Sequence, residues 1–130
     1  MLTCCVVFLI KLAISAQQNL PQISTALKNG KSADLINHFD LQIDLSFSDN
    51  TNTKINTYSK KQALVVLQNF FSRVEPNNYV TEQRGTSTFN NTKYCIGMLS
   101  TGHGKYKVYM FFKQRNEKYL LKELRFEKQL

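Results

Sequence analysis

The segment from Gly104 to Glu127 constrains the fold most strongly, because it has the pattern of two long β-strands joined by a short polar turn at Gln114–Glu117. Bulky side chains alternate with polar ones on both sides of the turn, and this period of two is typical of an antiparallel hairpin. The pattern places four apolar side chains of the first strand on one face: Tyr106, Val108, Met110 and Phe112. On the second strand it predicts one face with Leu120, Leu124 and Phe126, and the other with Tyr119, Leu121, Glu123, Arg125 and Glu127. We therefore expect one sheet face to pack against helices and the other to be only partly exposed to water.

The composition indicates one globular domain with a basic C-terminal third. The chain has 130 residues, of which 42% are hydrophobic and 20% charged, enough for one sizeable core. Its formal net charge is +8, and the part from Arg84 onwards carries +7, from ten basic and three acidic residues. A basic face of this kind suits nucleic acid, anionic lipid or an acidic partner. Because no arginine-rich cluster or RNA-binding motif accompanies the charge, we favour solvated strands whose lysines discourage sheet-to-sheet association, and we do not expect nucleic acid as a partner.

Residues 1–16 have the pattern of an export signal. The run from Cys4 to Ile10 is apolar, and small residues ending at Ala16 suit cleavage after that position. A basic start is missing and Lys11 interrupts the segment, so an apolar N-terminal helix packed on the domain is the alternative. The segment is too short to span a membrane. We predict a signal peptide over 1–16 and a single domain over 17–130, located in the periplasm or outside the cell and not integral to a membrane after cleavage.

The body of the chain contains one cysteine, Cys95, in the apolar run from Tyr94 to Leu99. A lone cysteine forms neither an intramolecular disulfide nor a metal site, and this sequence context is typical of a small buried strand residue. The sequence therefore leads us to expect no metal ion and no cofactor.

The remaining elements follow in a simple order. Two short helices are expected over 20–39, the first with Ile23, Ala26 and Leu27 on its apolar side and a stop at Gly30, and the second with a cap at Ser32. Its inward-facing residues are predicted to be Ala33, Leu35, Ile36 and Phe39. A cleanly alternating strand over 41–47 and a short one over 54–58 precede a long helix that begins after Ser59 and ends at Pro76. Its apolar stripe is Ala63, Leu67, Phe70, Phe71 and Val74, and the last four strands are expected to run antiparallel over 79–85, 93–100 and the hairpin.

This order of elements resembles the nuclear transport factor 2-like (cystatin-like) α+β fold, in which a bent antiparallel sheet wraps around one long helix. Several phrases are similar to a family of small, exported, uncharacterised proteins of Bacteroidota. They are Ile23–Gly30, Tyr58–Ala63, Phe70-Phe71, Gly104–Tyr109 and Tyr119–Glu127. The resemblance covers nearly the whole chain after the leader. It implies the fold and export, and it carries no activity, because fold alone does not define function.

An enzyme on this fold would need a carboxylate or histidine base in a dry pocket, facing an acidic donor such as tyrosine. The weak catalytic candidates are Asp40 and Asp44, followed by His38 and His103. No nucleophile elbow, phosphate loop or zinc-ligand cluster accompanies them. An isomerase- or dehydratase-type enzyme using Asp40 or Asp44 is therefore an alternative hypothesis.

The hypothesis that the sequence favours is an exported, non-catalytic domain that binds an unknown small ligand or a protein. We expect binding at the mouth of the cone and name Tyr109 and Arg125 as candidate contacts, although for Arg125 we favour a structural role, either a cross-strand salt bridge or packing of its stem on an aromatic ring. Two further alternatives stay open. One is binding of a polyanion by the basic strands, and the other is a homodimer through the outer sheet face.

Overall fold

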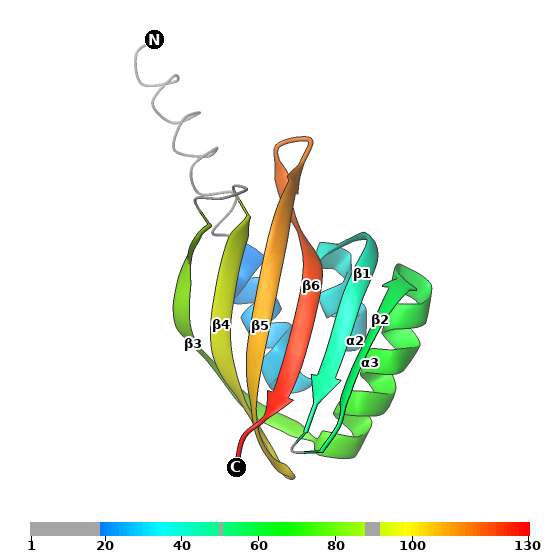
Figure 1. Cartoon of the computed structure of the whole chain (residues 1–130), viewed down its shortest axis with the longest axis vertical. Helices are drawn as coiled ribbons and strands as arrows, with labels where there is room; N and C mark the ends of the chain where they lie inside the picture. Colours follow the sequence, from blue (N-terminus) through cyan, green and yellow to red (C-terminus); the bar gives the residue numbers. More distant parts are fainter. Residues whose placement is uncertain (1–18, 50, 88–91) are drawn as a thin grey trace.

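A computed structural model describes residues 19–49, 51–87 and 92–130, and places three α-helices against a curved, mostly antiparallel six-stranded sheet (Figure 1). Residues 19–29 are helical, and the other helical elements are α2 (Ser32–Leu35), the 3-10 turn η1 (Ile36–His38) and α3 (Lys60–Val74). The strands are β1 (Phe39–Ser48), β2 (Thr53–Ser59), β3 (Pro76–Thr86), β4 (Lys93–Thr101), β5 (Gly104–Arg115) and β6 (Lys118–Lys128). The predicted α+β fold and order of elements are confirmed.

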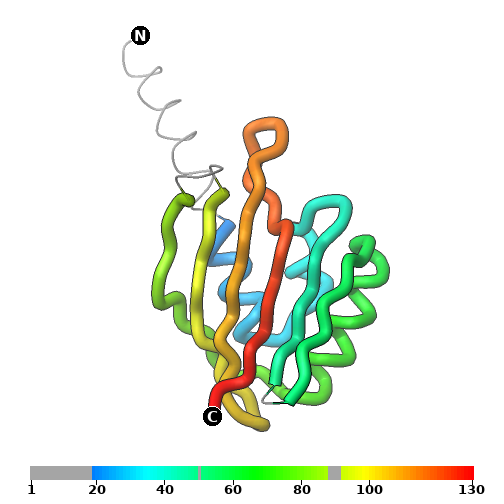
Figure 2. The backbone as a smooth tube through the Cα atoms, viewed as in Figure 1, coloured from blue at the N-terminus to red at the C-terminus, as the bar shows by residue number. Residues whose placement is uncertain are grey.

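The strand order in the sheet is β2-β1-β6-β5-β4-β3. Strands β3 to β6 form an antiparallel meander, which brings β6 beside β1, and these two strands pair in parallel. Figure 2 shows β1 and β6 side by side although β2, α3, β3, β4 and β5 lie between them in the chain. Helix α3 makes the connection between the β1–β2 hairpin and the meander.

Helix α3 begins and ends as its sequence predicts. The Ser59 side chain accepts from the Gln62 N–H at 3.3 Å, and the Gln62 side chain accepts from the Ser59 N–H at 3.1 Å, which completes a capping box. At the other end Glu75 has a left-handed backbone with φ 60°, and Pro76 begins β3. The buried residues of α3 are the five that its apolar stripe predicts: Ala63, Leu67, Phe70, Phe71 and Val74.

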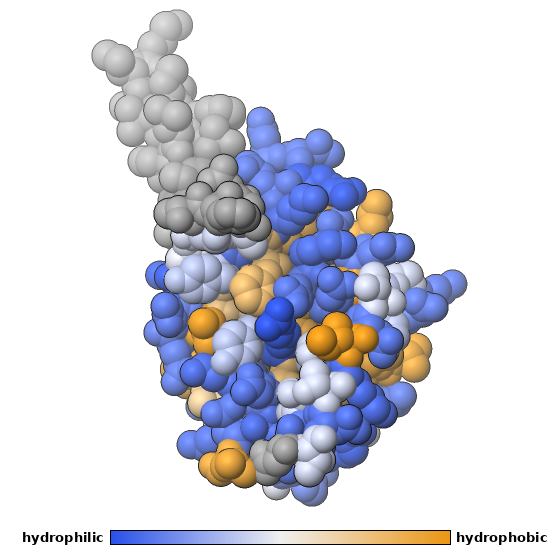
Figure 3. All heavy atoms as spheres, viewed as in Figure 1, coloured by the Kyte–Doolittle hydropathy of each residue, from blue (hydrophilic) through white to orange (hydrophobic). Residues whose placement is uncertain are grey.

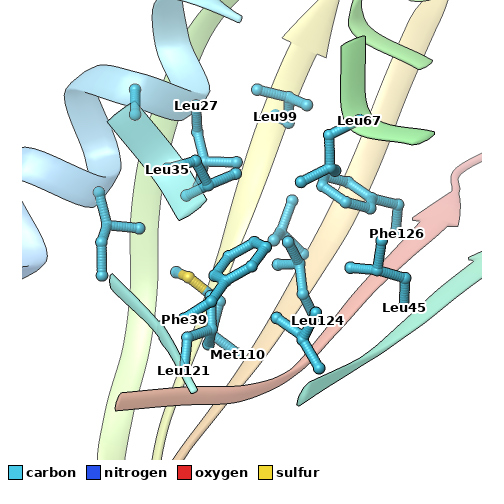
Figure 4. Close-up of a cluster of buried hydrophobic side chains, with 14 of the residues drawn as sticks. Leu27, Leu35, Phe39, Leu45, Leu67, Leu99, Met110, Leu121, Leu124 and Phe126 are labelled. Carbon is cyan, nitrogen blue, oxygen red and sulfur yellow. The ribbon is translucent and has the colours of Figure 1, made fainter. Parts of the chain in front are cut away.

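The core fills the space between the helices and one face of the sheet, here called the inner face and defined by Val108, Met110, Phe112, Leu124 and Phe126. Figure 4 shows leucines of the helices and side chains of the strands pointing toward one another in this core. The Phe70 ring of α3 lies 4.7 Å from the Phe126 ring, centroid to centroid. Burial of each such side chain contributes about 1.5–3 kcal/mol, so this face holds the helices on the sheet.

The predicted cap at Ser32 is wrong. The N-cap of α2 is Lys31, which makes no side-chain capping bond, and Ser32 is the buried first residue of the helix. Gly30 adopts φ 63° and the Lys31 N–H donates to the Ala26 carbonyl at 2.8 Å, so the first helix closes in a Schellman motif. The chain then enters α2 one residue earlier than predicted, and Ala33, expected to face inward, is exposed.

The strict alternation predicted for two strands is broken by irregular pairing. In β6, Leu121 is fully buried while Leu120 is only partly buried, because a register shift lies where Phe111 and Phe112 face this strand. In β1, the register with β6 shifts between Phe39 and Asp44, and Leu41 within this stretch is 69% exposed. A bulge moves the following side chains to the opposite face, so period two alone misplaces them.

Candidate functional site

The end of the sheet formed by the last residues of β3 and the first residues of β4 contains a cavity of about 220 Å³. Its wall combines the first helix with strands β3, β4, β5 and β6. The side chains that line it include Leu20, Arg84, Lys93, Cys95, Phe112 and Tyr119. We call this space the mouth cavity, because it lies at the end of the sheet where β3 ends and β4 begins.

The strand register explains why two cations meet above an apolar floor. Arg84 pairs with Cys95 across β3 and β4, and Lys93 pairs with Phe112 across β4 and β5. Residues opposite one another on antiparallel strands project from the same face. Because Cys95 and Phe112 are buried in the core, Arg84 and Lys93 lie on the inner face, at its outermost end. The charge is visible in the sequence, but the placement of both cations at one cavity follows only from the pairing of the strands.

The cavity wall is positively charged. Arg84 and Lys93 line it, whereas no aspartate or glutamate does so among the residues that the structure describes. The Lys93 ammonium lies 4.8 Å from the centroid of the Tyr119 ring, a cation–π contact that orients the lysine without neutralising it. Within the described ranges neither cation has a carboxylate partner. Arg84 is exposed and Lys93 is half-buried, so the two positive charges lie at the solvent-facing rim of the cavity.

Cys95, which lines the cavity, forms a buried, weakly polar contact with Tyr79. The Tyr79 hydroxyl lies 3.9 Å from the Cys95 sulfur, which in turn lies 4.0 Å from the Thr81 hydroxyl. Burial raises the pKa of Tyr79 far above its usual value, so this hydroxyl is neutral at physiological pH. The prediction that Cys95 is a small buried strand residue is confirmed, since only 1% of its surface is exposed.

The two carboxylates considered as catalytic candidates lie elsewhere. Asp40 is 3% exposed, accepts from the Leu41 N–H at 2.7 Å and lies 3.5 Å from the Arg115 guanidinium at the tip of the β5–β6 hairpin. Asp44 accepts from the Thr57 hydroxyl at 2.6 Å, across the β1–β2 pair. Neither belongs to the wall of the mouth cavity. Both are engaged in contacts that stabilise the local strands.

The two candidate binding residues lie on the outer face, the sheet face that carries Tyr109, Phe111 and Arg125 and is turned away from the core. Tyr109 and Arg125 are direct neighbours across β5 and β6. The Arg125 guanidinium forms a 2.8 Å ion pair with Glu123 and lies 5.4 Å from the centroid of the Phe111 ring. The expected packing of Arg125 on an aromatic ring is therefore present, whereas its ion pair joins two residues of β6 and is not the expected cross-strand salt bridge. Neither Tyr109 nor Arg125 lines the mouth cavity.

The outer face is largely hydrophilic in Figure 3, with apolar side chains in separate patches.

The two histidines also lie outside the cavity wall. Partial burial lowers the pKa of His38, and the negative charge of Asp34 opposes this effect. His103 lies in the exposed β4–β5 turn, where its N–H donates to the Thr101 hydroxyl at 3.0 Å.

No cluster of three or more histidine, cysteine, aspartate or glutamate side chains suited to a metal ion occurs in the described part of the chain. Across the same ranges, no helix combines the length and apolar character needed to cross a bilayer. The predicted signal peptide over 1–16 lies outside the described residues.

Residues 20–127, which include the whole sheet except the last residue of β6, match the family described as "Domain of unknown function (DUF4783)". The chain belongs to the DUF4783 family. The predicted resemblance to a Bacteroidota family with a nuclear transport factor 2-like fold is confirmed. A comparison with curated proteins gave no match.

Solved structures agree with this assignment. A DUF4783 protein from Bacteroides ovatus is 24% identical with a TM-score of 0.76, over 84% of this chain and 94% of that one. One from Bacteroides fragilis is 22% identical with a TM-score of 0.72, over 83% and 96% of the two chains. An NTF2-like protein of unknown function from Shewanella baltica shares 9% identity with a TM-score of 0.66, over 93% and 96%. These similarities establish the fold of the DUF4783 domain.

Sequence reasoning missed the cavity of this DUF4783 domain. The sequence marks Arg84 and Lys93 only as members of a basic third, and Tyr119 only as a strand residue and one of several tyrosines that could act as an acidic donor. A usable signal was present: both cations flank the expected β3–β4 connection, at the same end of the sheet as the hairpin turn. The missing information was the register, which decides the face from which each side chain projects.

Proposed function

We propose that this protein is an exported, non-catalytic binding domain that holds a small molecule in the mouth cavity. The observation that carries the proposal is the convergence of Arg84 and Lys93 over the apolar floor formed by Cys95 and Phe112. A pocket with an apolar lining and a few convergent polar groups is the usual form of a small-molecule site. The wall holds groups that attract and orient a ligand, whereas no carboxylate or histidine base belongs to it in the described ranges.

The enzyme alternative requires Asp40 or Asp44 to reach a bound substrate. Asp40 is occupied by Arg115 and the Leu41 N–H, and Asp44 by Thr57. A general base must lie within hydrogen-bond reach of the proton that it removes. We therefore favour binding over isomerase- or dehydratase-type turnover.

The polyanion alternative rests on the charge of the C-terminal third. Its cations are divided between the two faces and the hairpin tip, and Arg115 and Arg125 are already paired with carboxylates. A dispersed arrangement of this kind gives weak, salt-sensitive attraction rather than a defined site. Heparin affinity measured at several salt concentrations separates polyanion binding from small-molecule binding. Tight binding that falls steeply with salt would favour the polyanion alternative.

Export is part of the proposal and rests on the leader pattern of residues 1–16. The test is expression of the full chain in a Bacteroidota host, followed by cell fractionation and N-terminal sequencing. We expect a mature N-terminus at residue 17 in the periplasmic or extracellular fraction. An unprocessed cytosolic chain would overturn this part and leave the binding proposal intact.

The binding proposal itself is tested by amide NMR of the labelled protein against a library of small neutral and charged compounds. We expect hits whose shifts centre on Cys95, Phe112 and Tyr119. Shifts confined to the outer face around Tyr109 and Arg125 would move the site there. The same spectra, recorded at increasing protein concentration, would show line broadening if the outer face forms a homodimer.

A further inference from the structure

We propose that the ligand of the mouth cavity is a small organic anion, namely a carboxylate carried on a compact apolar body. This inference rests on the proposed function, since it specifies what the same cavity binds. The charge of the wall, the apolar floor and the size of the cavity support it.

The charge of the wall is the first argument. Two other arginines on this sheet, Arg115 and Arg125, have carboxylate partners at 3.5 Å and 2.8 Å. Arg84 and Lys93 have none within the described ranges, although they share one cavity. Two like charges brought together without a counter-ion repel one another, and an anion between them removes that repulsion. The arrangement is therefore complementary to a negatively charged group.

The floor is the second argument, and it excludes a purely inorganic anion as the best ligand. Phe112 and Cys95 are only 5% and 1% exposed, so the apolar surface that a ligand can cover is mainly that of half-buried Leu20 and Tyr119. A fully hydrated ion would leave this surface in contact with water, whereas an apolar body would cover it and gain roughly 25 cal/mol per Å². The ligand therefore combines one anionic end with one apolar end.

The size of the cavity is the third argument. Its volume of about 220 Å³ is below the range of roughly 300–1,000 Å³ typical of pockets for drug-sized ligands. The Tyr119 ring, held by the Lys93 ammonium, supplies a flat wall beside the cationic end. A single aromatic ring or a short branched chain bearing one carboxylate fits this description.

The experiment uses benzoate as the probe, with benzamide as its neutral isostere and inorganic phosphate as an anion without an apolar body. Each is titrated into the labelled full-length protein, and the dissociation constant is taken from amide shifts. We expect benzoate to bind at the cavity at least tenfold more tightly than benzamide or phosphate, a difference of about 1.4 kcal/mol.

The variants Arg84→Gln and Lys93→Met each remove one cation of the cavity. We expect each to weaken benzoate binding about tenfold, while benzamide binding changes less than twofold. Lys105→Met is the matched control, because Lys105 is exposed on β5 and does not line the cavity. It removes the same charge from the protein and is expected to leave benzoate binding within twofold. Unchanged melting temperatures show that the variants are folded.

Each contrary outcome overturns a defined part of the inference. Equal binding of benzoate and benzamide would show that the cavity takes neutral molecules, which overturns the anion and leaves the binding function standing. Equal binding of phosphate and benzoate would overturn the apolar body. A weakening by Lys105→Met equal to that by Arg84→Gln would mean that net charge, and not this site, attracts the anion. Failure of every probe and every library compound to bind would overturn the proposed function as well.

Discussion

The ring of Tyr79 on β3 lies across Gly97 on β4, so closely that a Cβ atom built at position 97 would overlap the tyrosine hydroxyl. The absence of a side chain at Gly97 therefore allows an aromatic ring to lie flat against the inner face and to reach Cys95 beneath the mouth cavity. This relationship links the packing of the sheet to the floor of the proposed site.

Gly97→Ala should consequently destabilise the protein. The added methyl group meets a ring that is held by the core, and overpacking of this kind costs about 1–3 kcal/mol. Chemical denaturation measures the loss. Gly102→Ala is the control, since its Cβ would come no closer than 3.3 Å, to the flexible Glu75 carboxylate. The Tyr79→Ala background should reduce the cost of Gly97→Ala, and an undiminished cost would mean that another contact is responsible.

Arg115→Ala should destabilise the protein by about 1–3 kcal/mol, because it leaves the carboxylate of Asp40 almost fully buried without its cation. Lys118→Ala serves as the control, since Lys118 is the cross-strand neighbour of Arg115 at the same hairpin tip. The measurement is the free energy of unfolding of each variant, compared with that of the parent protein. Equal, small losses would show that the Leu41 N–H alone suffices to stabilise Asp40.

The stability of the protein should decrease as the pH falls from about 7.5 to about 5, in part through His38. Burial lowers the pKa of His38 below its ordinary value, so the unfolded chain takes up a proton before the folded one does. The associated stability is present above the unfolded pKa and is lost as the pH falls through that value toward the folded pKa. His38→Gln should flatten this dependence in denaturation experiments at several pH values. A variant with the same slope as the parent protein would assign the pH dependence to other titratable groups. The negative charge of Asp34 opposes the effect of burial on the pKa of His38.

The double variant Tyr109→Ala, Arg125→Ala should leave benzoate binding within about twofold, because both residues lie on the outer face. Loss of the exposed Arg125–Glu123 ion pair is worth at most about 1 kcal/mol. A pull-down with the same variant tests the outer face as a protein-binding surface. A partner that is lost by this variant and retained by Arg84→Gln would place the interaction on the outer face.

Local patterns predicted most of the elements correctly, because their causes lie within a few residues. The capping box at Ser59 and Gln62 and the apolar stripe that ends at Val74 defined α3 almost to the residue. The predicted cap at Ser32 failed because the preceding Schellman motif, closed by Lys31 and Ala26, moved the start of α2. The buried position of Leu121 was missed because a bulge is a property of two paired strands.

The amino-acid sequence by itself determined the α+β class, the long central helix and the meander of strands, since period and capping are local properties. Only the tertiary structure decided that β6 lies beside β1, that Tyr79 covers Gly97, and that Arg84 and Lys93 meet over Phe112. These relationships depend on strand register and sheet curvature, which arise when residues distant in the chain pack together. The candidate site is composed entirely of such relationships, and for this reason it appeared only with the fold.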